Sequence, residues 1–170
     1  YHDEMRDTKG KLRVLSLFSG CGGMDLGFEG MFIANRKSFP QDSLYIDHAI
    51  NKNWVMLKKT KFKTVFANDI LNEAEVAWTT YMSRFGYQPE MYHNISIVDL
   101  VKMHKQGADI FPKDIEVVTG GFPCQDFSVA GKRKGFNSDK DDYGKKREGD
   151  EPSEETRGKL YYWMKQVITT

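Results

Sequence analysis

The sequence is poor in cysteine and contains no long hydrophobic run. Its 2 cysteines, Cys21 and Cys124, cannot build a disulfide framework, and this fits a protein of the reducing cytoplasm. No stretch reaches the ~18 apolar residues that a membrane span needs, and the polar first residues are unlike a signal peptide. Neither cysteine has a partner at metal-ligand spacing and the 4 histidines are scattered, so we expect no metal site.

A large excess of charge of one sign is also absent. The 170 residues hold 25 Lys and Arg against 24 Asp and Glu, so the net charge of +1 neither favours nor excludes a nucleic-acid partner. With 39% hydrophobic residues, the composition excludes a wholly disordered chain. The length suits one domain with a core of its own.

Short apolar runs alternate with amphipathic stretches along the chain. The runs expected to be buried strands are residues 12–18, 64–69 and 115–119. The stretches expected to be helices are residues 72–85, 96–105 and 160–168. Asn72 and Glu75 resemble a capping box at the start of the first helix. The alternation indicates βαβ units, and therefore an α/β fold with a mostly parallel sheet.

Two charged segments interrupt this alternation. Residues 36–63 carry seven Lys or Arg against Asp42 and Asp47, a local excess of five positive charges. We interpret this basic insertion as a mainly solvated segment that folds in part, with a contact to a nucleic-acid backbone as the alternative. Residues 132–159 carry seventeen charges in twenty-eight positions and no Leu, Ile, Val or Met, so we expect a mobile loop there.

A glycine-rich turn follows the first expected strand. Ser19-Gly20-Cys21-Gly22-Gly23 stands between that strand and a helix, an arrangement in which backbone N–H groups can approach a nucleotide-like ligand. The dinucleotide fingerprint fails at Asp25 and no Walker lysine follows, which favours a cofactor with a carboxylate over one with a pyrophosphate. Asp69 ends the second strand, where a carboxylate can hold ribose hydroxyls; as the alternative, it caps the next helix.

Cys124 follows the carboxyl end of the third expected strand, where α/β proteins gather their sites. A lone cysteine is most often a small buried hydrophobe, but Pro123 fixes the backbone before this one. The polar and basic residues that follow it are Gln125, Ser128, Lys132, Arg133 and Lys134. Nearby positive charge lowers the pKa of a thiol, so the pattern indicates a reactive cysteine. Cys21, within the glycine turn, is expected merely to pack.

Two motifs in this order resemble the first and fourth motifs of the cytosine-5 DNA methyltransferases. They are Leu17-Phe18-Ser19-Gly20-Cys21-Gly22-Gly23 and Gly121-Phe122-Pro123-Cys124-Gln125-Asp126-Phe127-Ser128. The resemblance extends to Asn68-Asp69, Asn94-Ile95 and Arg157-Gly158-Lys159-Leu160. It implies a Rossmann-like, S-adenosylmethionine-dependent methyltransferase fold that is incomplete in this chain. It also implies a bacterial-type cytoplasmic enzyme, either of a restriction-modification system or an orphan methyltransferase.

The resemblance implies S-adenosylmethionine as the cofactor and S-adenosylhomocysteine as the product. The implied cofactor-binding residues are Phe18, Ser19, Gly20, Cys21, Gly22, Gly23, Asp69, Ile70, Asn94, Ile95 and Leu160. Asp69 would hold the ribose hydroxyls, Ile95 would pack near adenine, and Leu160 would close the pocket. The family usually has an acid in place of Asn94 and often an aromatic in place of Ile70, so the adenine contacts depart from its pattern.

The resemblance also implies a covalent mechanism on double-stranded DNA. Cys124 would add to C6 of a flipped cytosine, C5 would then attack the methyl group, and loss of the C5 proton would release the cysteine. Phe122 would line the base pocket and Pro123 would shape the turn. The residues that would contact DNA, mainly at its phosphates, are Gln125, Ser128, Lys132, Arg133 and Lys134.

Several parts of such an enzyme are not found in these residues. No Glu-Asn-Val strand end follows Leu160 and no target-recognition segment is present. We therefore expect residues 1–170 to be the N-terminal part of a catalytic domain that a longer chain or a second chain completes. Three alternatives stay open: a tRNA cytosine-5 methyltransferase of the same fold, a non-catalytic cofactor- or DNA-binding scaffold subunit and, more remotely, an oxidoreductase. The intact Pro123-Cys124 pair argues against the scaffold.

Overall fold

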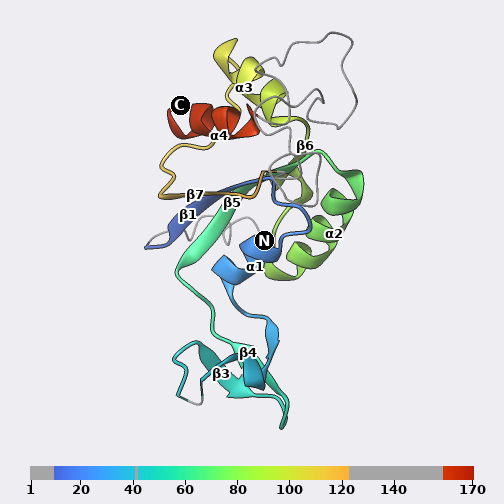
Figure 1. The fold of residues 1–170 in the computed structure, drawn as a ribbon, viewed down its shortest axis with the longest axis vertical. Coiled ribbons are helices and arrows are strands. Elements are labelled where there is room, and N and C mark those ends of the chain that lie inside the picture. Colours follow the sequence, from blue (N-terminus) through green and yellow to red (C-terminus); the bar gives the residue numbers. More distant parts are fainter. Residues whose placement is uncertain (1–9, 41, 123–158) are drawn as a thin grey trace.

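The computed structural model describes residues 10–40, 42–122 and 159–170 of the chain. In this part, the chain forms a parallel sheet with helices on both faces and a small antiparallel sheet apart from it (Figure 1). Cys124 and most of the segment 132–159 lie outside the described residues.

The main sheet has four parallel strands in the order β6-β5-β1-β7. These strands are β1 (Leu12–Leu17), β5 (Phe62–Asp69), β6 (Tyr92–Asn94) and β7 (Val117–Gly120). Residues 14–17 of β1 are all buried because helices cover both faces of the sheet, and this explains the nearly continuous apolar run in the sequence. The predicted α/β class with a mostly parallel sheet is confirmed.

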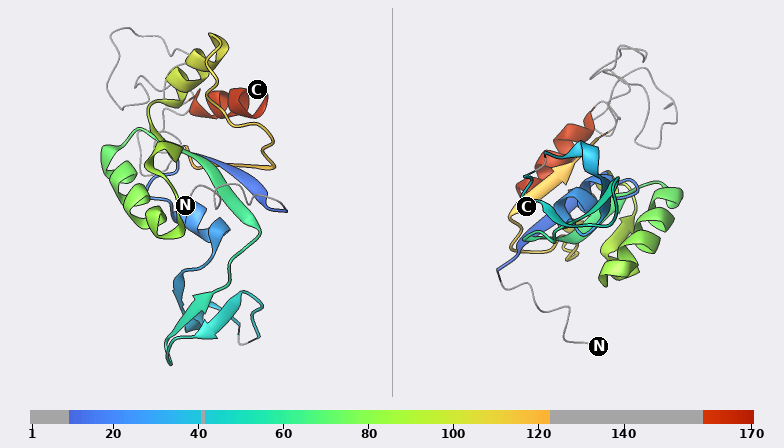
Figure 2. Two further views of the ribbon diagram at one scale, coloured as in Figure 1. Left: turned by 180° about the vertical axis from the view of Figure 1, so that it is seen from behind. Right: turned by 90° about the horizontal axis from the view of Figure 1, so that it is seen from below.

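In the described ranges, four α-helices cover the sheet, two on each face (Figures 1 and 2). They are α1 (Gly23–Glu29), α2 (Asn72–Met82), α3 (Ile97–Lys105) and α4 (Leu160–Ile168). The adjacent β5 residues Phe66 and Ala67 point to opposite faces. Phe66 belongs to the hydrophobic cluster under α3 and α4, and Ala67 belongs to the cluster under α2. A hydrogen bond from Trp78 to Asp25 joins α2 to α1.

Two hydrophobic clusters fix the strand ends against these helices. The buried members of the larger cluster are Leu15, Leu17, Phe66, Ile97, Val98, Leu100, Val101, Phe111, Leu160, Trp163 and Val167. The smaller cluster contains Trp78, whose side chain is fully buried, together with Ala67, Met82, Tyr87 and Tyr92. Each large apolar side chain buried in this way contributes about 1.5–3 kcal/mol, so both helix layers hold the sheet firmly.

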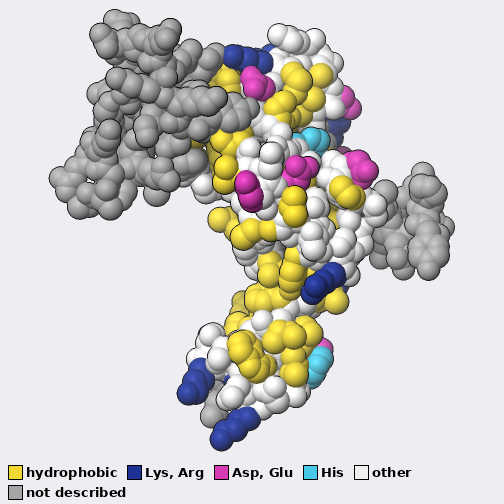
Figure 3. Space-filling model, turned by 90° about the vertical axis from the view of Figure 1, so that its right-hand side faces the viewer, with side chains coloured by type: hydrophobic (Ala, Val, Ile, Leu, Met, Phe, Trp, Pro, Cys, Tyr) yellow, Lys and Arg dark blue, Asp and Glu magenta, His cyan; other side chains and the backbone are white. Residues whose placement is uncertain are grey.

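A three-stranded antiparallel sheet occupies much of the basic insertion. Its strands, in the order β2-β4-β3, are β2 (Ile33–Asn35), β4 (Trp54–Leu57) and β3 (Ile46–Ala49), and the 3-10 turn η2 (Arg36–Ser38) follows β2. This small sheet extends away from the amino end of the main sheet, and hydrophobic side chains gather on its surface (Figures 1 and 3). Backbone pairing orders part of the insertion around buried Val55 and Leu57, while most of its other described residues are exposed, in line with the expectation of a mainly solvated segment that folds in part.

The start of α2 also differs from the expectation. Asn72 is the first helical residue rather than a cap, and Leu71 precedes it without a side-chain hydrogen bond to the helix end. The predicted capping box with Glu75 is therefore wrong. The Asp69 carboxylate instead accepts hydrogen bonds from the two N–H groups just before the helix.

The segment between α2 and α3 contains two 3-10 turns and the short strand β6. After Met82, α2 passes into the 3-10 turn η3 (Ser83–Phe85), which ends at Gly86 with φ 81°, a conformation that favours glycine at a helix end. The next turn, η4 (Pro89–Met91), leads into β6. Neither η4 nor β6 was predicted, because three residues of Tyr-His-Asn sequence carry no periodic signal.

Candidate functional site

The four strands of the main sheet end in one row, and the predicted site residues lie at or just after their ends. The register pairs Leu17 of β1 with Asn68 on one side and with Gly120 on the other. Asp69, the last residue of β5, is paired with Asn94 at the end of β6. The glycine turn, the acid and the segment after β7 therefore start from the same edge of the sheet, where α/β folds bind their ligands.

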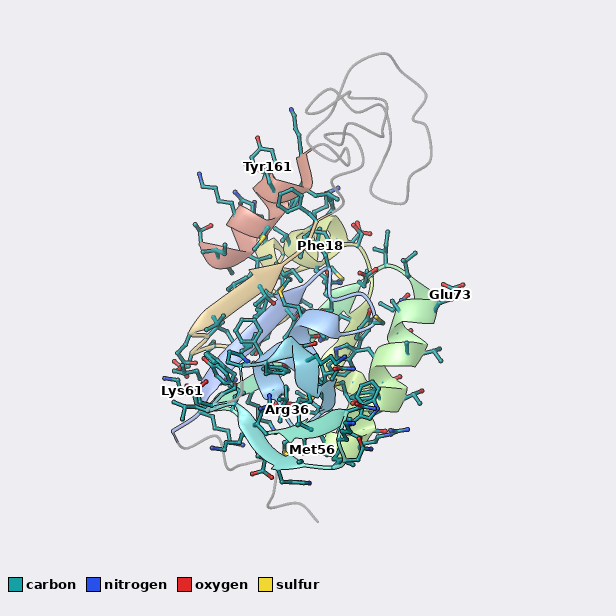
Figure 4. All side chains as sticks on the ribbon, turned by 60° about the horizontal axis from the view of Figure 1, so that its bottom comes forward. Phe18, Arg36, Met56, Lys61, Glu73 and Tyr161 are labelled. Atoms are coloured by element: carbon teal, nitrogen blue, oxygen red, sulfur yellow. The ribbon has the colours of Figure 1, made fainter. Side chains whose placement is uncertain are left out.

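The glycine turn after β1 is held in a strained conformation. Phe18 has a positive φ of 54°, and Figure 4 shows it at the end of the sheet near α3 and α4. The Ser19 N–H donates to the Asn68 carbonyl at 2.8 Å, and the Ser19 hydroxyl accepts from the Asn68 N–H at 3.1 Å. A non-glycine residue at positive φ costs of order 1–3 kcal/mol. The turn keeps this shape because these two hydrogen bonds attach Ser19 to Asn68 of β5.

Asp69 binds the glycine turn directly. Its Oδ2 accepts from the Gly20 N–H at 3.0 Å, while Oδ1 accepts from the N–H groups of Ile70 at 2.8 Å and Leu71 at 3.1 Å. The helix cap of α2 is Leu71, so the alternative interpretation of Asp69 as that cap is wrong. Asp69 and Ile70 are half-buried, and a carboxylate oxygen can accept more than one hydrogen bond. The carboxylate therefore keeps capacity for a hydroxyl donor.

The end of β6 places an amide beside this carboxylate. Asn68 Nδ2 donates to the carbonyls of His93 at 2.8 Å and Ile95 at 2.7 Å, which fixes the backbone there. The Nδ2 of Asn94 is buried and has no hydrogen-bond partner among the described residues. Because buried polar atoms are nearly always satisfied, this donor next to Asp69 is one that a bound ligand can engage.

Tyr92 is a site residue that the sequence did not reveal. Its hydroxyl donates to the Gly20 carbonyl at 3.1 Å, so β5 and β6 hold Gly20 by its N–H and its carbonyl respectively. Burial, and next the nearby Asp69 charge, raise the pKa of Tyr92, so its hydroxyl stays a donor at neutral pH. The contact depends on the pairing of β6 with β5, and no local sequence pattern predicts that pairing.

A buried acid under the turn was also missed. Asp25 of α1 is 0% exposed, and the Trp78 indole N–H donates to its Oδ2 at 2.6 Å. Burial raises the pKa of Asp25, against the opposing effects of the Ser16 hydroxyl and the Trp78 indole. A Cβ atom on Gly22, which has φ 87°, would lie 2.6 Å from Trp78 Cδ1. Gly22 is therefore required by its conformation and by the close approach of the indole.

The segment after β7 begins against the same turn. The Phe122 ring lies edge-on to Phe18, with 6.3 Å between ring centroids and 75° between planes. Leu160, at the start of α4, is buried in the larger cluster, against which Phe18, Phe122 and Ile95 also pack. A Cβ on Gly120 would lie 2.9 Å from Met164 Sδ, so α4 sits directly against the end of β7. Phe18, Phe122 and Leu160 are thus brought together.

The remaining predicted residues are exposed or not described. Cys21 is exposed, so the expectation that it packs is wrong; Gly20 and Gly22, both at positive φ, flank it. The predicted residues outside the described ranges are Pro123, Cys124, Gln125, Ser128, Lys132, Arg133 and Lys134.

In the part of the chain that the structure describes, no group of three or more metal-ligating side chains occurs. The same residues contain no helix with the length and apolar character to cross a membrane.

The strand order and the ligand edge define a Rossmann-like methyltransferase fold. The family model described as C-5 cytosine-specific DNA methylase matches residues 12–143. The chain belongs to this family of DNA cytosine-5 methyltransferases.

Its relatives include several Type II methyltransferases. The chain is 35% identical over 126 residues to the Type II methyltransferase M.BsuRI of Bacillus subtilis, a match over 72% of this chain and 25% of the relative. It is 33% identical to M.BspRI of Lysinibacillus sphaericus, over 78% of this chain and 28% of the relative. M.HgiGI of Herpetosiphon aurantiacus is 31% identical over 72% of this chain and 67% of the relative. The chain thus spans about a quarter of the first two relatives.

Proposed function

We propose that this chain is the cofactor-binding and nucleophile-bearing part of a DNA cytosine-5 methyltransferase that acts on double-stranded DNA in the cytoplasm. The observation that carries the proposal is the register of Leu17, which lies between Asn68 and Gly120. This register aligns the glycine turn, Asp69 and the strand that leads to Cys124 at one edge. The family and its Type II relatives support cytosine in DNA as the substrate class.

The residues at this edge fit S-adenosylmethionine. The Asp69 carboxylate, half-buried and with accepting capacity left, suits two ribose hydroxyls, and the buried Asn94 Nδ2 offers a donor beside it. The Trp78 indole leaves no room for a side chain at Gly22, so the turn has bare backbone at this position. The residues that would contact the cofactor are Phe18, Ser19, Gly20, Cys21, Gly22, Gly23, Asp69, Ile70, Asn94, Ile95 and Leu160. When bound, the cofactor supplies a methyl group that its sulfonium makes electrophilic.

Cys124 is the proposed nucleophile. Cytosine C5 reacts poorly with electrophiles, and addition of the Cys124 thiolate to C6 makes C5 a nucleophile. After methylation, loss of the C5 proton to a base expels the thiolate and restores the aromatic ring. The target base has to leave the stacked duplex first, at a cost of a few kcal/mol. Phe122 would line the base pocket.

We further propose that other segments complete the site. The proposed phosphate contacts, which give affinity without reading sequence, come from Gln125, Ser128, Lys132, Arg133 and Lys134. Target recognition and the remaining base contacts would come from a longer chain or a second chain, since the first relatives are about four times as long as the matched part. Residues 1–170 alone would bind the cofactor weakly and transfer no methyl group to DNA.

The Asp69→Asn variant tests the cofactor proposal. Asparagine keeps the size of the side chain but replaces one accepting oxygen by a donor, so a charge-assisted hydrogen bond to ribose is lost. We expect S-adenosylmethionine to bind at least about tenfold more weakly, measured by isothermal titration calorimetry on this chain.

Two controls separate ribose binding from damage to the turn. The exposed Asp99→Asn change on α3 removes the same charge away from the site and should leave the affinity unchanged. A 2′-deoxyribose analogue of the cofactor should bind wild type more weakly than S-adenosylmethionine, yet bind Asp69→Asn almost equally well. If the variant discriminates between the two ligands as wild type does, Asp69 does not hold the ribose.

A further inference from the structure

A small cavity lies where the basic insertion rejoins the body, at the opposite end of α1 from the glycine turn. Its volume is about 280 Å³ and its lining includes Lys11, Lys59, Lys63 and Arg84. These cations come from separate places: the residue before β1, the connection from β4 to β5, β5 itself and the turn η3. Four cationic residues therefore line one opening from several directions, and the Arg84 guanidinium also lies 5.4 Å from the centre of the Tyr81 ring.

The protein supplies little negative charge to balance them. Glu29 is the one acid in the lining and is 6% exposed. It already accepts hydrogen bonds from the Thr64 N–H at 2.5 Å and from the Tyr87 hydroxyl. Among the described residues, the single salt bridge joins His48 to Asp47, so none of the four cations has an ion-pair partner there. The lining carries four positive charges against one negative charge, an excess of three.

Three of these ammonium groups lie close enough to influence one another. Burial and the adjacent Lys59 and Lys63 lower the pKa of Lys11, and Glu29 opposes the effect. The Lys63 ammonium lies 4.9 Å from the centre of the Tyr87 ring, which holds this lysine in place at the cavity. Folding thus brings like charges together at the cavity, an arrangement that a multivalent anion would stabilise.

We infer that this cavity binds a phosphate group. A carboxylate ligand would leave most of the excess charge uncompensated, whereas a phosphate offers up to two negative charges and several oxygens for donors on different sides. The bound group would hold Lys59 of the insertion to Lys11 and Arg84 of the body and so stabilise their junction. Its source is either free phosphate or a backbone phosphate of nucleic acid, and the first source is independent of the proposed methyltransferase function.

The test compares two neighbouring lysines. Lys59 lines the cavity, whereas the exposed Lys58 does not, so Lys58→Gln removes the same charge one residue away. Inorganic phosphate should raise the thermal unfolding temperature of wild type relative to chloride at equal ionic strength, because it binds the folded state. We expect Lys59→Gln and Arg84→Gln each to weaken phosphate binding about tenfold in calorimetric titrations, and Lys58→Gln to leave it within about twofold.

A second arm identifies the source of the phosphate. The same variants are titrated with a short DNA duplex in the absence of cofactor. A selective loss with phosphate alone assigns the site to free phosphate, and a selective loss with the duplex assigns it to a nucleic-acid backbone. The inference is overturned if Lys59→Gln and Lys58→Gln behave alike with both probes. Because neither arm measures cofactor binding or methyl transfer, this result leaves the proposed function untouched.

Discussion

Single contacts shape the glycine turn more than the motif alone suggests. The motif predicted glycines for backbone approach to a ligand, and the structure adds a second reason at Gly22. The Trp78 indole, held by its hydrogen bond to Asp25, fills the space that a side chain there would need. The glycine at position 22 is therefore required by packing inside the protein as well as by the expected approach of a ligand.

This contact gives a stability prediction. Gly22→Ala places a Cβ 2.6 Å from Trp78 Cδ1 at φ 87°, so we expect a loss of about 1–3 kcal/mol in unfolding free energy and weaker cofactor binding. The control is Gly27→Ala in α1, where nothing lies within 4 Å of the added Cβ. That change should be neutral or stabilising by up to about 1 kcal/mol. Equal urea midpoints for the two variants would show that the indole does not shape the turn.

The buried Asp25 gives a prediction for pH. Because burial raises its folded-state pKa above the ordinary 3.8, the folded protein binds this proton more tightly than the unfolded chain does. Stability therefore falls as pH rises from the unfolded value through the folded pKa, and the penalty remains above it. Asp25→Asn keeps an oxygen for the Trp78 indole and removes the titration. Urea unfolding from pH 4 upward should show a flatter profile for the variant; identical slopes would contradict this assignment.

Secondary-structure elements were predictable where their patterns are long or strongly apolar. The apolar run at 12–18 and the face repeated along 74–85 identified β1 and α2, because burial of one side or both leaves a period in the sequence. The small sheet was not predicted from the sequence because its strands are three or four residues long and lie among lysines. In the site, Asp69 and the glycine turn were predicted from local motifs. Tyr92, Asp25 and Trp78 were not, because their roles arise from pairing and packing between distant segments.

The small sheet appended to the body gives a prediction about modularity. The Met31 N–H donates to the Lys58 carbonyl at 3.3 Å and Gly30 bridges Lys59, so the two ends of the insertion already lie side by side. Replacing residues 32–57 by Asn-Gly should close a two-residue hairpin there. We expect unfolding free energy to change by less than about 1 kcal/mol, since loop-closure entropy depends weakly on length. Loss of cofactor affinity in this deletion would show that the insertion supports the distant site.

The whole molecule combines the proposed cofactor edge of the sheet with the strand that leads to the proposed nucleophile. Family membership and the parallel character of the main sheet agree with the sequence-based expectation. The residues that would act on the base follow Phe122, whose ring already lies against Phe18 of the glycine turn. The proposed function therefore requires Cys124 to reach a cytosine while the glycine turn holds the methyl donor.

The most direct measurement is the identification of the trapped cysteine. The full-length gene product that contains this chain is incubated with S-adenosylmethionine and duplex DNA in which 5-fluorocytosine replaces the target cytosine. Elimination requires a base to remove the proton at C5. Fluorine takes the place of that proton and cannot be removed by a base, so the thiolate is not expelled and the adduct persists. Peptide mass spectrometry should find the DNA adduct on Cys124, retained in Cys21→Ser and lost in Cys124→Ser. An adduct on Cys21, or methyl transfer by Cys124→Ser at the wild-type rate, would contradict the account.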